Sequence, residues 1–179
     1  MPDLHLHARH FTDSAQRCVR HVTERAIERG MCWGEFTEAT SGMLAVLSIL
    51  RWERKVGRAA LENMKLDLDR LARAIDIAID EEGRRTSRYG SLEAEVVLPS
   101  GQRVLVVDRN TPLLPLLDHA EHEALGLCHN YVGTEHLLLA AVNNACPRLQ
   151  DVLRSFGITA DGVRQAIVDL LEERDRTPS

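Results

Sequence analysis

Lysine is nearly missing from this chain: among 22 basic residues, only Lys55 and Lys65 are lysines. Neither follows a glycine, so the phosphate-binding sequence Gly-x-x-x-x-Gly-Lys-Ser/Thr does not occur. We therefore expect that this chain does not hydrolyse ATP.

Long apolar runs, an amino-terminal signal and closely paired cysteines are missing as well. No apolar run approaches the roughly 20 residues of a membrane helix, and the first residues, MPDLH, lack a basic segment followed by an apolar one. The four cysteines include no Cys-x-x-Cys pair and are expected to be reduced thiols. The sequence thus predicts a cytoplasmic protein with no membrane partner.

Aromatic residues make up only 4% of the chain, against 44% hydrophobic and 27% charged residues. This balance is typical of a folded, aliphatic, helical protein and argues against disorder. The net charge of −5 gives no general reason to expect a nucleic-acid partner. The basic segment with Arg84, Arg85 and Arg88 is expected to be a solvated linker.

The chain contains an internal repeat. Residues 61–75 (LENMKLDLDRLARAI) align without a gap to residues 153–167 (LRSFGITADGVRQAI), and residues 42–47 (GMLAVL) resemble residues 137–142 (LLLAAV). Such self-similarity indicates two copies of one structural unit.

Each copy is predicted to form four helices. In the second copy, Thr111 and Pro112 are expected to open a helix that ends near Leu127, and Thr134 to cap a helix that ends near Asn144. A short helix should run from Pro147 to a left-handed cap at Gly157, and Thr159 should cap the last helix. The first-copy helices are expected near 12–29, 38–53, 56–64 and 67–82.

Residues 83–110 interrupt the helical pattern. Residues 83–91 are predicted to be a flexible linker, and the β-branched runs 93–98 and 102–108 around Pro99-Ser100-Gly101 predict a β-hairpin. A lone hairpin is marginally stable in water, so it should pack on the helices or pair with a second copy of the chain. The expected organisation is a disordered tail 1–10, repeat 1 at 11–82, linker and hairpin at 83–110, repeat 2 at 111–174, and a tail at 175–179.

A sequence signature lies in the second copy. Residues 123–139 read EALGLCHNYVGTEHLLL, and residues 153–158 follow with a Leu-x-x-Phe-Gly-Ile segment. This stretch closely resembles the Clp repeat of the Clp/Hsp100 N-terminal domains, with Leu-Gly-His and Gly-Thr-Glu-His-Leu-Leu, although Cys128 replaces the usual glycine. The first copy is degenerate, because Glu38-Ala39-Thr40-Ser41 stands where Gly-Thr-Glu-His should follow.

The resemblance implies an all-α fold of two pseudo-twofold four-helix repeats, about eight helices, with the hairpin inserted between them. In the family this domain precedes ATPase modules, receives substrates and adaptor proteins, and in some members binds phosphorylated arginine. With no ATPase sequence here, the resemblance implies a free-standing, non-enzymatic binding protein.

The properties of a helix amino terminus support a ligand-binding prediction for the Gly-Thr-Glu-His segment. A helix that begins at Thr134 would offer unpaired N–H groups and a positive dipole end to an anion, and the Glu135 carboxylate suits a guanidinium. Phosphoarginine carries both groups, so the predicted ligand-binding residues are Tyr131, Thr134, Glu135 and His136. The alternative is structural: Glu135 only complements the helix dipole, and His136 packs inside.

No metal, cofactor or catalytic site is predicted. His119 and His122 lie three residues apart beside Glu123, and three further histidines (His5, His7, His10) lie near the amino terminus. A zinc site needs three or four converging ligands, which these patterns do not provide. Cys128 beside His129 has no evident orienting acid, so nucleophilic catalysis is not expected either.

Two functional hypotheses remain from the sequence. In the first, the chain is an accessory protein, adaptor or decoy, of the Clp ATPase–protease system. Its partners would be Clp ATPase or protease subunits, or protein substrates that carry a degradation mark such as arginine phosphorylation. In the second, the repeat fold is an interaction scaffold unrelated to proteolysis that forms homodimers through its hairpin.

Overall fold

The computed structural model describes residues 11–31, 37–52, 55–86, 95–97, 103–105 and 113–176. The described residues form eight helices: α2 (Asp13–Glu28), α3 (Glu38–Trp52), α4 (Val56–Asn63), α5 (Leu68–Thr86), α6 (Leu114–Gly126), α7 (Thr134–Asn143), α8 (Pro147–Ser155) and α9 (Ala160–Arg176). They also include two strands, β1 (Glu95–Val97) and β2 (Arg103–Leu105). The described part of the chain is all-α apart from this short pair, and the predicted helices are confirmed to within a few residues at most ends.

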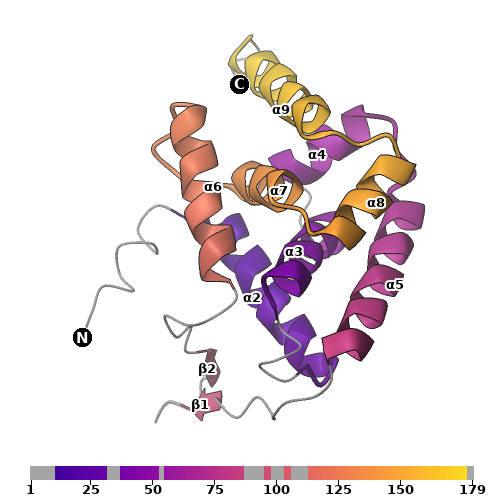
Figure 1. The fold of residues 1–179 in the computed structure, drawn as a ribbon. Coiled ribbons are helices and arrows are strands. Elements are labelled where there is room, and N and C mark those ends of the chain that lie inside the picture. Colours follow the sequence, from indigo (N-terminus) through magenta and orange to yellow (C-terminus); the bar gives the residue numbers. More distant parts are fainter. Residues whose placement is uncertain are drawn as a thin grey trace.

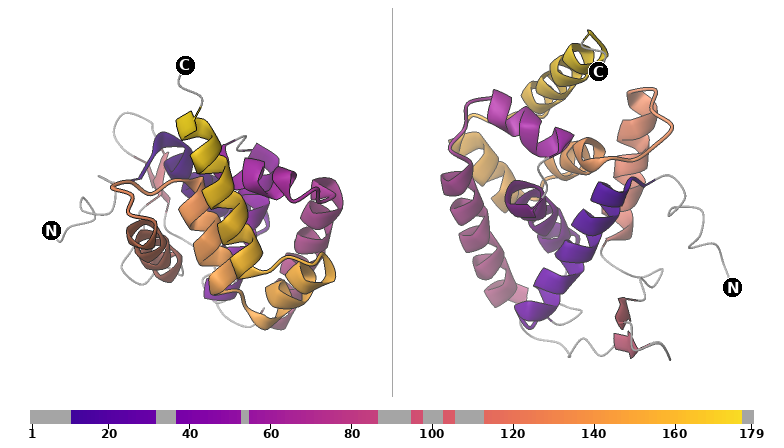
Figure 2. Two further views of the ribbon diagram at one scale, coloured as in Figure 1. Left: turned by 90° about the horizontal axis from the view of Figure 1, so that it is seen from above. Right: turned by 180° about the vertical axis from the view of Figure 1, so that it is seen from behind.

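Helices α3 and α7 lie in the middle of the molecule, and the other helices surround them (Figures 1 and 2). Every residue of α7 from Thr134 to Val142 is buried. A helix that is apolar nearly all round must be covered on all sides. Leu137, Leu138 and Leu139 of α7 are fully buried, so this helix forms the centre of the core.

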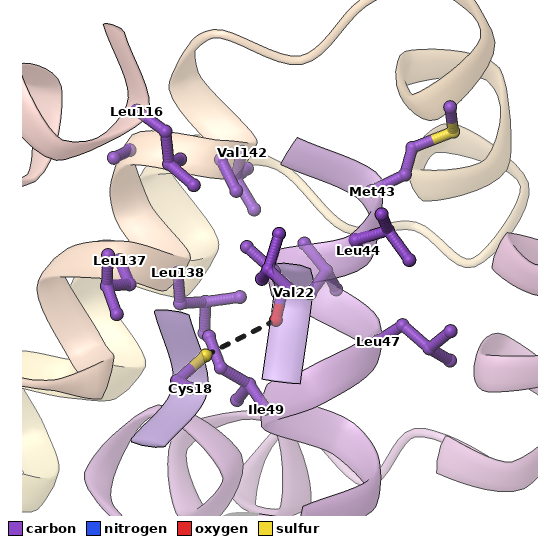
Figure 3. Close-up of a cluster of buried hydrophobic side chains, with 14 of the residues drawn as sticks. Cys18, Val22, Met43, Leu44, Leu47, Ile49, Leu116, Leu137, Leu138 and Val142 are labelled. Carbon is purple, nitrogen blue, oxygen red and sulfur yellow. Dashed lines mark hydrogen bonds between the residues drawn. The ribbon is translucent and has the colours of Figure 1, made fainter. Parts of the chain in front are cut away.

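The core joins the two copies directly. Leu138 of α7 meets Ile49 of α3 beside Cys18 and Val22 of α2 (Figure 3). The Cys18 thiol lies 3.9 Å from the carbonyl oxygen of Ala45. Among the described residues, Cys18, Cys128 and Cys146 are free cysteines. None of the described helices is both long enough and apolar enough to cross a membrane.

The outer helices pack reciprocally across the two copies. Helix α4 of the first copy packs on α9 of the second, and α8 of the second copy packs on α5 of the first. Within each copy, α2 packs on α3 and α6 packs on α7. This exchange is consistent with the predicted pseudo-twofold pair, and it places the start of α4 against α7 and α9.

Local capping interactions form at several helix termini, and those at Thr159 and Gly157 were predicted from the sequence. The Thr12 side chain accepts a hydrogen bond from the Ala15 amide at the start of α2, and Thr159 accepts one from the Gly162 amide at the start of α9. Gly157 has φ +69° after α8, and the Ile158 amide donates to the Leu153 carbonyl. This is the left-handed glycine cap predicted there.

Helix α6 is described from Leu114, and the predicted opening residues Thr111 and Pro112 lie outside the described residues. Two other predicted boundaries are wrong. Helix α5 continues to Thr86, so residues 83–86 are helical; arginine is a good helix former. Helix α9 runs to Arg176, into the predicted carboxy-terminal tail.

The strands β1 and β2 pair antiparallel, with Val96 opposite Val104. They coincide with parts of the two β-branched runs. The rest of the predicted hairpin and linker, residues 87–94, 98–102 and 106–110, and the predicted disordered tail 1–10 lie outside the described residues. The packing of the hairpin on the helices or on a second copy stays a prediction.

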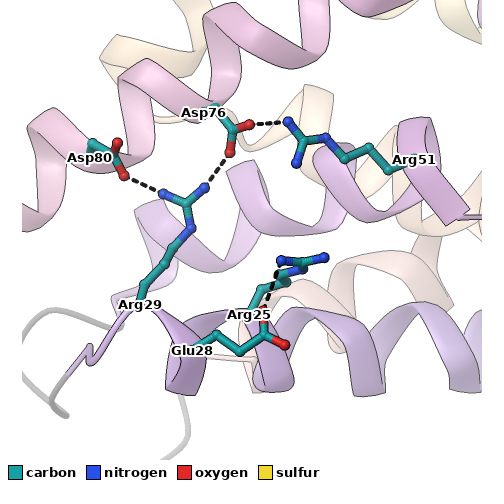
Figure 4. Close-up of polar contacts among 6 residues, drawn as sticks. All are labelled: Arg25, Glu28, Arg29, Arg51, Asp76 and Asp80. Carbon is teal, nitrogen blue, oxygen red and sulfur yellow. Dashed lines mark hydrogen bonds and ion pairs between the residues drawn. The ribbon is translucent and has the colours of Figure 1, made fainter.

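An ion-pair network ties α2, α3 and α5 together at the edge of the molecule. Arg29, which caps α2, pairs with Asp76 and Asp80 of α5, and Arg51 of α3 pairs with the other oxygen of Asp76 (Figure 4). Asp76 therefore bridges two arginines. Half-buried networks of this kind fix helix positions more effectively than isolated surface pairs do.

Candidate functional site

The segment between α6 and α7 carries the signature residues. After α6 ends, Cys128 adopts a left-handed conformation with φ +57°, and the His129 amide donates to the Ala124 carbonyl over 2.9 Å. The Thr12 amide donates to the Val132 carbonyl over 2.9 Å, which joins the loop to the start of α2. The loop is therefore held at both ends before it enters α7.

Thr134 does not cap its own helix. Gly133 is the N-cap residue of α7, and Thr134 is the first helical residue. The Thr134 hydroxyl instead accepts a hydrogen bond of 3.3 Å from the amide of Gly57 in the first turn of α4, where Lys55 provides no side-chain cap. Only 1% of Thr134 is exposed, so it caps a helix that lies 77 residues away in sequence.

The contact between α4 and α7 is close because residue 57 is a glycine. A Cβ atom at this position would lie 2.8 Å from the carbonyl oxygen of Thr134. The amino-terminal end of α7 therefore faces α4 rather than solvent. The expectation that this helix end presents its N–H groups outward to an anion does not fit this packing.

Glu135 lies in the first turn of α7 with 2% of its surface exposed. Burial raises the pKa of its carboxyl group, while a hydrogen bond from its own backbone amide, the charge of His129 and a hydrogen bond from Tyr131 act in the opposite direction. The carboxylate curls back over Gly133, where a Cβ atom would lie 2.3 Å from one of its oxygens. Glycine at position 133 makes room for this buried acid.

His136 lies at the third position of α7 and is fully buried. Its Nδ1 accepts a hydrogen bond of 2.8 Å from the Gly133 amide, so it fills the position that Glu or Gln takes in a capping box. Its Nε2 lies 2.8 Å from Nδ1 of His129. Burial, and secondarily the charge of His129, lower the pKa of His136 to about 4, so His136 is neutral at pH 7.

His129 and Tyr131 are the half-buried members of this cluster. Their rings stack, with centroids 4.9 Å apart and planes 11° from parallel, and each meets the His136 ring edge-on. Both rings line a mainly apolar pocket of about 200 Å³ against the end of α6, with Leu125 72% exposed at its side. The rings of His129 and Tyr131 therefore lie between the surface and the buried side chains of Glu135 and His136.

The four residues predicted from the sequence, Tyr131, Thr134, Glu135 and His136, lie close together in the structure. Three of them are buried, with the side chain of Thr134 directed to α4. His129 is a further member of this group that was not among the predicted site residues. It belongs to the Leu-Gly-His part of the same signature, which is the signal that could have identified it.

His129, Glu135 and His136 also form a group of metal-ligating residue types, with ligand atoms within 4.8 Å of one another. The hydrogen bonds oppose metal binding. The Gly133 amide can only donate, so it occupies Nδ1 of His136, and the remaining Nε2 must then carry the hydrogen of the neutral ring. A metal ligand would need a free lone pair at Nε2.

Two of the residues considered for a metal site, His122 and Glu123, have other partners. Nδ1 of His122 is hydrogen-bonded to the carbonyl oxygen of Asp118 in its own helix over 2.7 Å. Glu123 pairs with Arg164 of α9 and accepts a hydrogen bond from Asn143 of α7. These contacts give Glu123 a structural role between three helices. His5, His7 and His10 lie outside the described residues.

The matching helix of the first copy starts differently. The amide of Thr37 donates to the Thr40 hydroxyl over 2.8 Å, and the Thr40 amide donates to the Thr37 hydroxyl over 3.3 Å. This reciprocal pair closes the start of α3, and Glu38 is exposed. Within the described residues, the first copy holds no buried carboxylate at this position.

A family comparison covers the second half of the chain. Residues 111–178 match the family model described as "Clp repeat (R) N-terminal domain". An "ATP-dependent Clp protease ATP-binding subunit ClpA homolog" of Trieres chinensis is 30% identical over 129 residues, which are 72% of this chain and 12% of that protein. The "Negative regulator of genetic competence ClpC/MecB" of Bacillus subtilis is 27% identical over 142 residues, 79% of this chain and 18% of that protein. The chain thus spans less than a fifth of each of these two relatives.

Solved structures share the fold. The N-terminal domain of Hsp104 from Candida albicans matches with a TM-score of 0.55 at 14% identity, over 90% of this chain and 91% of that one. The N-terminal domain of the chaperone ClpD from Arabidopsis thaliana matches with a TM-score of 0.56 at 14% identity, over 92% and 96% of the two chains. The similarity extends over both copies of the repeat.

Proposed function

We propose, on the premise that residues 111–178 belong to the Clp repeat N-terminal domain family, that this chain is a non-enzymatic protein-binding module. It would act as an adaptor or decoy of a Clp ATPase–protease system. Its binding site would be the cluster around Glu135, and its ligand an arginine that carries a phosphoryl group on a protein substrate. Homodimerisation through the hairpin remains the rival hypothesis.

One observation carries the proposal: Glu135 is a buried acid with a raised pKa, positioned behind the half-buried Tyr131. A carboxylate that folding removes from water is costly unless a cation or several donors compensate it. The pKa is raised although Tyr131 and the backbone already donate to it, so these donors compensate the cost only partly. A buried acid with a perturbed pKa near a pocket is a candidate for ligand binding.

A guanidinium would complete this arrangement. It can replace the Tyr131 hydroxyl as the partner of Glu135 and form a paired, charge-assisted contact with both carboxylate oxygens. Rotation of Tyr131 would be needed, because only 2% of Glu135 is exposed. The pocket beside Tyr131, of about 200 Å³, offers space next to that ring.

The test is calorimetric titration of phosphoarginine into the wild-type chain and the Glu135→Gln variant. We expect at least a tenfold loss of affinity in the variant, since a charge-assisted hydrogen bond is replaced by a neutral one. Stability at pH 7 should stay equal or rise, because the variant removes a buried charge. A matched control is Asp161→Asn, which changes an exposed acid in the first turn of α9.

The Tyr131→Phe variant is a second test, and its expected result is opposite to that of Glu135→Gln. It keeps the ring and removes the hydroxyl that competes for Glu135, so it should bind phosphoarginine no more weakly than wild type. Equal binding by wild type and Glu135→Gln would refute the site.

Affinity capture with wild type and Glu135→Gln tests the proposed association with a Clp ATPase–protease system. We expect wild type alone to recover Clp subunits. Recovery of only the chain itself by both variants would favour the scaffold hypothesis.

A further inference from the structure

Helices α5 and α8 form an open groove at the edge of the molecule. The two helices pack on each other and lie side by side (Figure 1). The groove has a volume of about 440 Å³ and shares no lining residue with the pocket beside Tyr131. One part of its lining is apolar and includes Ile77 and Val152, and the other part is charged, with Glu81, Glu82, Arg148 and Asp151.

The repeat provides an internal comparison for this groove. The alignment of the two copies relates the contact of α5 with α8 to the contact of α9 with α4. On α4, Val56 and Ala60 are 8% and 0% exposed, so aliphatic side chains are packed into that contact. The same alignment places Arg148 and Val152 of α8 at these two positions, and both are only half-buried. A charged side chain thus stands where the first copy buries a valine, and the groove stays open.

Ile77 of α5 also differs from its counterpart. It is 60% exposed, and the alignment places the exposed Asp169 of α9 at the same position. The Asp169 carboxylate accepts a hydrogen bond of 2.7 Å from Gln165. A single exposed isoleucine is ordinary in a folded protein, but Ile77 borders the same groove as Val152. The groove therefore has an apolar surface where the related helix has a polar residue.

The charged part of the groove has more carboxylates than cations. Arg148 pairs with Glu81, and its Nε lies 3.3 Å from a carboxylate oxygen of Glu82, so one guanidinium serves two acids. Asp151 adds a third carboxylate. It pairs with Arg154, but these two side chains are 75% and 73% exposed, and such surface pairs are weak. The groove therefore combines an excess of negative charge with an apolar surface.

We propose that this groove binds an unmodified arginine side chain from a partner protein. The aliphatic stem would lie on Ile77 and Val152, because long cationic side chains cover apolar surface while their charged end stays at the rim. The guanidinium would pair with Glu81 and Glu82 in place of Arg148. An acidic side chain would be repelled by the carboxylates, and a short apolar one would not reach them. The inference is independent of the proposed function, since the groove contains no residue of the cluster around Glu135.

The test uses the full chain and a dye-labelled, capped peptide, Ala-Leu-Arg-Leu-Ala, with a second peptide in which citrulline replaces arginine. Citrulline has nearly the shape of arginine and no charge. In fluorescence anisotropy titrations at low salt, we expect wild type to bind the arginine peptide about five- to tenfold more tightly, the range for a charge-assisted contact that water partly screens. Equal affinities would overturn the cationic ligand, and absence of binding would overturn the groove as a site.

Two substitutions test the two parts of the lining. Glu81→Gln should weaken binding of the arginine peptide about fivefold and leave the citrulline peptide unaffected. Its matched control is Glu173→Gln on α9, because the repeat alignment relates positions 81 and 173, and this variant should bind like wild type. Ile77→Asn should weaken both peptides, since it removes the apolar contact for the stem. Unchanged affinities in Glu81→Gln and Ile77→Asn would overturn the site.

Arg148→Met should have the opposite effect. It removes the competing guanidinium and keeps an unbranched stem, so the arginine peptide should bind about fivefold more tightly. Unchanged or weaker binding would overturn the competition. Urea unfolding establishes that the variant is folded, and Glu81→Gln decides the site independently of Arg148.

Glu135→Gln separates this inference from the proposed function. It should leave binding of the arginine peptide unchanged, because Glu135 does not line the groove. Loss of binding in Glu135→Gln but not in Glu81→Gln would overturn the groove as the site of this peptide.

Discussion

Glu135 and His136 are adjacent buried ionisable residues whose pKa values move so as to favour the neutral form of each. Burial raises the pKa of Glu135 and lowers that of His136 to about 4. Both shifts oppose charge inside the protein. The two residues therefore affect stability in opposite directions when the pH falls.

For His136 the sign follows from proton binding. The unfolded chain binds a proton near pH 6.5, whereas the folded chain binds it only near pH 4. Between these values the unfolded state holds more protons, so stability is full above pH 6.5 and is lost as the pH falls toward 4. For Glu135 the folded state binds the proton first, so acidification through its raised pKa removes a destabilising charge.

We predict that His136 contributes a loss of about 3 kcal/mol in the free energy of unfolding between pH 6.5 and 4. The measurement is urea unfolding across this range for Glu135→Gln and for Glu135→Gln with His136→Asn, so that Glu135 does not mask the effect. The difference between these two variants should shrink as the pH falls. A difference independent of pH would show that His136 is not held neutral.

Two helix ends in the second copy share one geometry with different residues. After α6, Cys128 has φ +57° and the His129 amide donates to the Ala124 carbonyl. After α8, Gly157 has φ +69° and the Ile158 amide donates to the Leu153 carbonyl. Only glycine adopts this left-handed conformation without steric cost, so Cys128 is strained where Gly157 is not.

We therefore predict that Cys128→Gly raises the free energy of unfolding by about 1 kcal/mol, and that Gly157→Ala lowers it by about the same amount. Cys128 is exposed, so no core contact is lost. Paired thermal and urea unfolding measure both effects. Destabilisation by Cys128→Gly would indicate that the cysteine side chain has a role of its own in the loop.

The capping threonines are of two kinds: some cap their own helix, and one caps a helix that is distant in sequence. Thr12 and Thr159 accept bonds from amides three residues away in their own helices, and sequence pattern finds such residues. Thr134 has the same appearance in the sequence but caps α4, 77 residues away. A pattern confined to one segment cannot reveal this, because it depends on where another helix packs.

At the scale of the whole molecule, the two copies exchange their outer helices. Helix α9 packs on α4 of the first copy, and α8 packs on α5 of the first copy. Val163 and Ile167 of α9 and Leu149 and Leu153 of α8 are buried. We expect helices α8 and α9 to lose part of their apolar cover when the first copy is removed, although the four helices of the second copy are contiguous in sequence.

We predict that a fragment of residues 111–179 does not fold cooperatively by itself. Burying apolar surface is the main source of stability, and the fragment lacks its partners for α8 and α9. Far-UV circular dichroism during urea unfolding should show a broad transition without a folded baseline. Co-expression with residues 1–110 is the control and should restore it, whereas a sharp transition of the isolated fragment would refute the exchange as a requirement for folding.

The sequence by itself determined the eight helices, the repeat and the signature at residues 129–136. These features depend on periodicity and on caps within a few residues, which are local interactions. The tertiary structure decided what the signature residues do. The packing of α4 on α7 covers Thr134. Glu135 and His136 are buried next to it, and burial shifts the pKa of both. The ring of His136 then connects the Gly133 amide to His129, a residue absent from the predicted site. The contact of α4 with α7 joins residues 77 positions apart, so no pattern within a single segment contains it.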